Sequence, residues 1–305
     1  MTIRAAVPGL RRGVFVLLAF LTAATAAVAG PACTSIDAVP YEVTAPGLYC
    51  LTHDLTYDGV EGAAILVLSD DVTIDLGPFT LTGTGGPGTF STGIFASDRR
   101  GITVRNGTIS GFLYGLLILD EEATHWSLGG GHLVRNVTFL ANYFRGVRTE
   151  GRGNVIEGCH VSGTGATTIF GAGNFAFGIE VFGPGTQVTR NLVEDTVAGA
   201  GGESVGISLS DSCYGSVVEG NMIQNPALSA TFRSFGVWIG GGSSVLLIDN
   251  RFSRVNLGGA YEVQAFGLYR DNLSAGCDEV VRECINSDCS ANADNPNVID
   301  GGGNN

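Results

Sequence analysis

An arginine and two glutamates in the middle of the chain, Arg148, Glu150 and Glu180, have the residue types for chemistry on an acidic sugar. Arginine can hold a uronate carboxylate through paired hydrogen bonds, and a neighbouring glutamate can take or give a proton next to that carboxylate. Such a set is typical of a lyase or an epimerase, and we predict these three residues as catalytic. A plain ion pair between neighbouring strands is the alternative that the sequence leaves open.

A repeat along the chain predicts how these residues are positioned. A glycine-led phrase of alternating residues returns at intervals of roughly thirty residues, at Gly93, Gly115, Gly146, Gly178, Gly206, Gly236 and Gly267. A second phrase places an asparagine, expected to point inward, at Asn106, Asn136, Asn191, Asn221 and Asn250. The repeats are rich in Val, Ile, Thr, Phe and Gly and have no helical periodicity, so we predict an all-β solenoid of about eight coils.

Stacking of the coils predicts a functional face. Side chains alternate along a strand, so residues two and four positions after each glycine should point outward. Equivalent residues of adjacent coils then lie about 4.8 Å apart, which brings Arg148, Glu150 and Glu180 together. Aromatic rings offer flat apolar contact to sugars, with a face covered by a loop as the alternative. The predicted substrate-binding residues on this face are Phe95, Phe182, Ser208, Ser210, Trp238 and Tyr269.

Residues 1–29 have the features of a signal peptide. Arginines precede an apolar run from Val14 to Leu21, and Ala27-Val28-Ala29 has the small residues of a cleavage site. The run is too short to span a membrane, although an uncleaved anchor is the alternative. We therefore expect a secreted or periplasmic protein without membrane insertion.

The charge of the chain limits the classes of partner that it can bind. The formal net charge is −13, and every basic residue is an arginine. An acidic surface argues against nucleic acid and against anionic membranes. A polysaccharide partner remains, including an anionic one that binds a local arginine cluster; the oligomeric state stays open.

Behind the leader we predict one domain in three parts: an N-terminal cap at 30–61, the β-helix at 62–276, and a cysteine-rich C-terminal cap and tail at 277–305. Caps are expected because an open solenoid end exposes core and unpaired strand edges.

The seven cysteines all follow the leader, and an exported protein can keep disulfides. Cys33 and Cys50 are predicted to pair in the first cap, and Cys277 and Cys289 are candidates for a bridge in the last one. Cys159 holds the position that asparagine holds in other repeats, so we expect a buried thiol there.

The insert from Asp120 to His132, DEEATHWSLGGGH, is rich in chemically active side chains. Its three acids could hold Ca²⁺, and His125 or His132 could serve as acid–base groups. Because the spacing matches no standard calcium loop, a solvated loop is the alternative and we assign no metal ligand.

Three phrases resemble the coils of secreted right-handed parallel β-helix proteins of the pectate-lyase-like superfamily: AAILVLSDDVTIDLGPFTLTG, GITVRNGTISGF and FGVWIGG. The resemblance covers nearly the whole chain after the leader and implies a single-stranded right-handed parallel β-helix. The superfamily includes lyases, epimerases, hydrolases, tailspikes and adhesins, so the fold alone does not define an activity.

No catalytic set can be transferred from this superfamily. The Asn-Thr-Asp and Gly-His-Gly motifs of polygalacturonases and the Asp-Pro-His-Asp motif of alginate epimerases are absent. Pectate lyases have Trp-Ile-Asp-His, whereas Trp238-Ile239 is followed here by two glycines. We therefore expect a polysaccharide-binding protein, with lyase or epimerase chemistry on uronate chains as its finer activity. A non-catalytic adhesin or envelope protein, and a glycoside hydrolase using Glu150 and Glu180, are the open alternatives.

Overall fold

The computed structural model describes residues 32–120, 129–171, 174–199, 201–210, 212–225, 234–262, 265–275, 277, 279–284 and 298–304. Contacts divide the chain into Met1–Ala32 and Cys33–Asn305, and the architecture below is that of the second unit. The predicted signal peptide, residues 1–29, lies outside the described residues. None of the described helices is long and apolar enough to cross a membrane.

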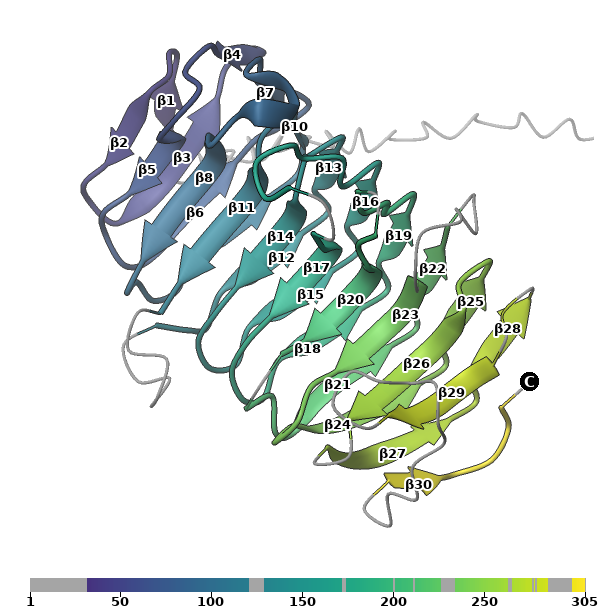
Figure 1. The fold of residues 1–305 in the computed structure, drawn as a ribbon. Helices are drawn as coiled ribbons and strands as arrows, with labels where there is room; N and C mark the ends of the chain where they lie inside the picture. The colour runs from purple at the N-terminus through teal and green to yellow at the C-terminus, as the bar shows by residue number, and fades with distance from the viewer. Residues whose placement is uncertain are drawn as a thin grey trace, which may run out of the picture. The chain divides into compact units, whose positions relative to one another are not determined.

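Successive coils of the chain add strands to three parallel sheets, named A, B and C here (Figure 1). Sheet A consists of β1 (Thr34–Ile36), β3 (Gly47–Leu51), β6 (Val72–Asp75), β9 (Thr103–Arg105), β12 (Leu133–Arg135), β15 (Val155–Glu157), β18 (Gln187–Thr189), β21 (Ser216–Glu219), β24 (Ser244–Ile248), β27 (Phe266–Arg270) and β30 (Val298–Asp300). Sheet B consists of β2 (Tyr41–Val43), β5 (Ala63–Val67), β8 (Thr92–Ser97), β11 (Tyr114–Leu119), β14 (Arg145–Thr149), β17 (Ala176–Val181), β20 (Ser204–Leu209), β23 (Ser234–Ile239), β26 (Leu257–Glu262) and β29 (Glu279–Cys284). Sheet C consists of β4 (Leu55–Tyr57), β7 (Thr80–Gly83), β10 (Thr108–Ser110), β13 (Thr138–Leu140), β16 (His160–Ser162), β19 (Leu192–Glu194), β22 (Met222–Gln224), β25 (Arg251–Ser253) and β28 (Leu273–Ala275), and a short 3-10 helix spans Gly86–Gly88.

The predicted parallel β-helix is confirmed, and its coil number is close to the predicted eight. The segments 30–61 and 277–305, predicted as caps, contribute β1–β4 and β29–β30 to the sheets. The paired region is therefore longer than the predicted 62–276. At its N-terminal end this happens because inward residues such as Ile36 and Val43 continue the buried core. A closing role of these ends stays a prediction.

Aliphatic side chains fill the space between the sheets. In sheet B the residue directly after each repeated glycine points inward and is fully buried: Ile94, Leu116, Val147, Ile179, Ile207 and Val237. Sheets A and C add columns of the same kind, with Val104 and Ile109 as examples. The period-two alternation of the sequence predicts this arrangement correctly.

The repeated glycines of sheet B lie where that sheet approaches sheet C. A Cβ atom at Gly178 would lie 2.5 Å from Val193 Cγ1 and 2.6 Å from the carbonyl oxygen of Gly206. Equally close contacts would arise at the other members of the column, Gly93, Gly115, Gly146, Gly206 and Gly236. No larger residue fits without movement of the next coil, which explains why the glycine recurs.

Asparagines form a buried ladder at the corner between sheets A and C. Asn221 donates from Nδ2 to Asn250 Oδ1 at 3.0 Å and to the Val188 carbonyl at 2.8 Å, and accepts from Asn191 at 3.0 Å. Asn250 is bound in the same way to Asn272 at 3.1 Å. The ladder supplies partners for backbone groups that a buried corner would leave unpaired.

The predicted inward position of Asn106 and Asn136 is wrong. Both have a left-handed backbone, with φ of 62° and 54°, and they precede the ladder position by one residue. Asn136 is exposed, and Asn106 donates from its side chain to Asp75 Oδ1 at 2.7 Å. Asparagine suits this turn because its short side chain tolerates the left-handed region.

Two cysteine predictions are confirmed. Cys33 and Cys50 form a disulfide. Cys159 lies in the asparagine ladder, where its backbone N–H donates to Asn191 Oδ1 at 2.9 Å. Burial raises the pKa of the Cys159 thiol to about 12, so it is not a nucleophile at neutral pH. The proposed partner of Cys277, Cys289, lies outside the described residues.

We predict that Gly178→Ala lowers the free energy of unfolding by about 1–3 kcal/mol, because the added methyl group collides with Val193 and with the next coil. Gly88→Ala is the matched control, since its added Cβ would lie 3.7 Å from Thr168 Oγ1, the nearest atom apart from its chain neighbours. The denaturant midpoint of both variants measures the effect. Equal midpoints for Gly178→Ala and the wild type would show that the column does not limit side-chain size.

Candidate functional site

Three columns of side chains cover the outer face of sheet B. The middle column holds the residue two positions after each glycine, and strand pairing places Phe95, Leu117, Arg148, Glu180, Ser208 and Trp238 side by side in that order. A flanking column holds residues four positions after the glycine, including Glu150, Phe182 and Ser210. All predicted site residues except Tyr269 therefore belong to one face.

The predicted place of Tyr269 is wrong. Tyr269 lies on β27 in sheet A, pairs with Leu247 and packs against the core. The glycine phrase at Gly267 belongs to that strand, whereas Gly258 follows Gly236 in sheet B. A phrase of four residues cannot distinguish two strands of the same coil, because both have alternating apolar residues.

The third column is one that the sequence reasoning missed. It holds the residue directly before each glycine: Thr92, Tyr114, Arg145, Phe177, Val205 and Phe235. Residues three apart on a regular strand point to opposite faces, yet Arg145 and Arg148 both bind Glu180. The strand is therefore irregular at Gly146. The sequence does contain a sign of this column, since four of these six residues are aromatic or charged.

An ion-pair cluster occupies the centre of the face. Arg148 donates from Nε to Glu150 Oε1 at 2.8 Å, and its Nη1 lies 3.2 Å from Glu180 Oε2. Arg145 binds both oxygens of Glu180, with Nη2 3.2 Å from Oε1. Glu150 Oε2 also accepts the backbone N–H of Asp120 at 3.1 Å. The side chain of Glu180 is only 4% exposed, and that of Arg148 is 23% exposed.

The hydrogen bonds of this cluster limit what it can do chemically. Each carboxylate oxygen of Glu150 and Glu180 already accepts at least one hydrogen bond. A general base needs access to the substrate proton, and hydrolysis needs one carboxyl that gives up a proton. The arrangement therefore orders the face, and the catalytic role of Arg148, Glu150 and Glu180 stays a prediction.

Aromatic rings contact the guanidinium groups of Arg145 and Arg148. The guanidinium carbon of Arg145 lies 3.8 Å from the ring centre of Phe144 and 4.7 Å from that of Phe177. The guanidinium carbon of Arg148 lies 4.6 Å from the ring centre of Phe182. Cation–π attraction adds to the ion pairs and keeps both cations in place.

A hollow of about 180 Å³ lies beyond the ion pairs and is lined by Phe175, Phe177, Glu203, Val205, Ser208, Ser210, Phe235 and Trp238. Trp238 packs edge-on against Phe235, with ring centres 5.0 Å apart, and Phe175 stacks on Phe177 at 5.7 Å. The hydroxyls of Ser208 and Ser210 are 3.0 Å apart. We call this the aromatic pocket. Flat apolar walls with a few polar groups can hold a sugar ring.

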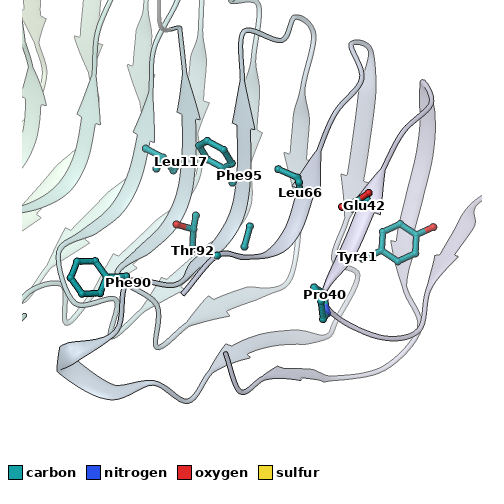
Figure 2. Close-up of a pocket in the computed structure, with 10 residues that line it drawn as sticks. Pro40, Tyr41, Glu42, Leu66, Phe90, Thr92, Phe95 and Leu117 are labelled. Carbon is teal, nitrogen blue, oxygen red and sulfur yellow. The ribbon is translucent and has the colours of Figure 1, made fainter. Parts of the chain in front are cut away.

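A second hollow of about 410 Å³ opens on the first coils of the same face. Figure 2 shows Leu66, Phe95 and Leu117 on neighbouring strands, with Phe90 contributed by the preceding loop and Glu42 toward the N-terminal end. Leu117 pairs directly with Arg148, so this apolar trough runs into the ion-pair cluster. Phe95, predicted to bind substrate, lines the trough.

The insert that suggested Ca²⁺ is described only at its ends. Residues 121–128, with His125, lie outside the described residues, and a Ca²⁺ site there stays a prediction. Elsewhere in the described chain, no three His, Cys, Asp or Glu side chains are grouped as metal ligands. His132 is 1% exposed and accepts the backbone N–H of Ile102 on Nδ1 at 3.2 Å. Its predicted acid–base role is wrong, because the ring lies inside the coil.

A family model described as a right handed beta helix region matches residues 88–261, more than half of the chain. The chain belongs to the right-handed β-helix family. This confirms the resemblance of the three coil phrases at the level of the fold. No curated protein matches the chain.

Two solved structures show the same β-helix fold at low sequence identity. The complex of XylC with xylose is 13% identical, with a TM-score of 0.50 over 72% of this chain and 38% of that one. The periplasmic alginate epimerase AlgG is also 13% identical, with a TM-score of 0.52 over 86% of this chain and 71% of that one. The chain thus spans well under half the length of the XylC structure, and the likeness is one of fold.

We predict that the buried His132 makes the β-helix acid-sensitive. Burial lowers the pKa of His132 to about 4, with a smaller opposing effect from Asp70. Between about pH 4 and 6.5 the unfolded chain binds a proton there that the folded chain does not, so stability is lost as pH falls through this window. The loss approaches about 3 kcal/mol at its lower end.

Urea unfolding at pH 7.5 and pH 4.5, with the wild type and His132→Gln side by side, measures this loss. The glutamine carbonyl can still accept the Ile102 N–H but cannot be protonated in this range. The wild type should lose more stability than the variant between the two pH values. Equal losses would contradict the assignment.

Proposed function

We propose that this chain is an exported polysaccharide-binding protein whose glycan lies along the outer face of sheet B. The aromatic pocket is the observation that carries the proposal, because Phe175 and Trp238 line it with aromatic rings beside Ser208, Ser210 and Glu203. The Cys33–Cys50 disulfide and the predicted signal peptide support export. Two structures of the same fold, a xylose complex and an alginate epimerase, are consistent with a sugar ligand.

The face has the length for a chain of sugars. From Phe95 to Trp238 the middle column crosses five strand spacings, which is roughly 24 Å at 4.8 Å each. The apolar trough and the aromatic pocket lie toward opposite ends of this distance. A polymer that runs across the strands would contact both hollows and pass over Arg148.

Binding is better supported than lyase, epimerase or hydrolase chemistry. The oxygens of Glu150 and Glu180 are held by Arg145, Arg148 and a backbone N–H, so catalysis would first have to break a buried ion pair. Removing a partner from such a pair costs several kcal/mol. A binding face needs no such step. An adhesin or envelope protein is compatible with this proposal as its biological setting.

Trp238→Ala tests the site. We expect binding to weaken by about tenfold or more, as for a central aromatic side chain at an interface. Phe266→Ala is the matched control, because Phe266 is an exposed aromatic residue on sheet A. Affinity electrophoresis through gels that contain soluble polysaccharides measures retardation, and ultraviolet absorbance and reducing-end assays follow turnover.

The outcomes separate the alternatives. Binding at this face is supported if the wild type and Phe266→Ala are retarded, Trp238→Ala is not, and no reaction product is formed. Unsaturated product that disappears in Glu180→Gln would instead establish a lyase. If none of the tested polysaccharides retards the wild-type protein, the proposal is wrong.

A further inference from the structure

We infer that the glycan bound on sheet B has an uncharged backbone and that the face discriminates against uronate chains. This inference rests on the proposed function and names its substrate class. It departs from the expectation that Arg148 grips a uronate carboxylate.

The two arginines of the face have no unpartnered nitrogen. In Arg148, Nε and Nη2 contact Glu150 and Nη1 contacts Glu180. In Arg145, Nε and Nη2 contact Glu180, and Nη1 lies 3.5 Å from the Tyr114 hydroxyl. Bidentate recognition of a carboxylate requires two adjacent N–H groups of one guanidinium. In both arginines a glutamate of the protein already occupies the Nε–Nη2 edge, so a uronate could use that edge only by displacing the glutamate.

That displacement is unfavourable because the glutamates are buried. The side chains of Glu150 and Glu180 are 7% and 4% exposed. A carboxylate that loses its arginine there keeps its charge away from water, which is costly. The exchange would replace a preorganised ion pair by one with a ligand that must also give up its own hydration.

The charge of the surrounding face acts in the same direction. Over the coils from β2 to β23, the described side chains of the three columns and the two hollows include two cations, Arg145 and Arg148. They include four carboxylates, Glu42, Glu150, Glu180 and Glu203. With a formal net charge of −13 for the whole chain, the face repels a polyanion.

Uncharged sugars neither displace a buried glutamate nor meet repulsion from the acidic face. Their hydroxyls can donate to carboxylate oxygens or share hydrogen bonds with Ser208 and Ser210, and their apolar ring faces can lie on Trp238 and Phe175. A neutral sugar ring can thus make both the apolar and the hydrogen-bonding contacts that the aromatic pocket offers.

Matched ligand pairs test the inference. Each pair has one backbone with and without charge: polygalacturonate and its methyl ester, alginate and its propylene glycol ester, and carboxymethyl and hydroxyethyl cellulose. For every backbone that is bound, we expect the neutral form to bind about tenfold or more tightly at low salt. The difference should shrink as salt screens the repulsion.

Charge variants locate the discrimination. Glu180→Gln frees part of the Arg145 and Arg148 donors, so binding of the anionic form should strengthen by about threefold or more relative to binding of the neutral form. Glu203→Gln makes the same charge change at the wall of the aromatic pocket and serves if Glu180→Gln does not fold. Glu219→Gln, exposed on sheet A, is the matched control and should alter neither form.

The failure of this inference differs from that of the proposed function. Binding of the charged form as tight as or tighter than the neutral form would overturn the inference and leave polysaccharide binding in place. An unchanged preference in both charge variants would also overturn it, because the face would not be its source. Absence of binding to all six chains would remove the proposed function and the inference with it.

Discussion

The close approach of sheet B to sheet C at the glycine column is the constraint on which the outer face depends. A Cβ atom at Gly146 would lie 2.6 Å from Val161 Cγ1 and 2.7 Å from the Gly178 carbonyl oxygen. The glycine therefore permits the coil to close, and the strand is irregular at the same residue. The irregularity turns Arg145 outward together with Arg148. One glycine per coil therefore lets the coils pack closely and adds a third column of side chains to the outer face.

Much of this could be predicted from the sequence, because the fold repeats one short pattern. The period gave the solenoid, and the alternation after each glycine predicted the neighbours Arg148, Glu180, Ser208 and Trp238. The inward column of Val147 and Ile179 follows from the same rule. These predictions held because a period of two is what a pleated strand imposes on its side chains.

The remaining features depend on single-residue offsets that no pattern of apolar residues records. Tyr269 follows a glycine phrase of another sheet, and Asn136 stands one residue before the ladder because the turn needs a left-handed residue there. Strict alternation counted back from Arg148 would place Arg145 inward, and it fails at Gly146. His132 looks like a loop residue in sequence, yet its backbone N–H donates to Asn154 Oδ1 within a buried corner. In each case tertiary packing decides the orientation, and local spacing does not.

The ion-pair cluster shows why residue types alone mislead about chemistry. Arginine beside glutamate suggested a carboxylate clamp with a base, but the structure joins the same groups to each other. Glu180 is shared between Arg145 and Arg148, both heads rest on phenylalanine rings, and the whole is held in a largely desolvated position. The charges of this cluster are balanced within the protein. A ligand can therefore be recognised only by its shape and through aromatic ring faces and hydroxyl groups. In the proposed binding mode, recognition comes from the aromatic pocket, while the charged centre acts by keeping other charges away.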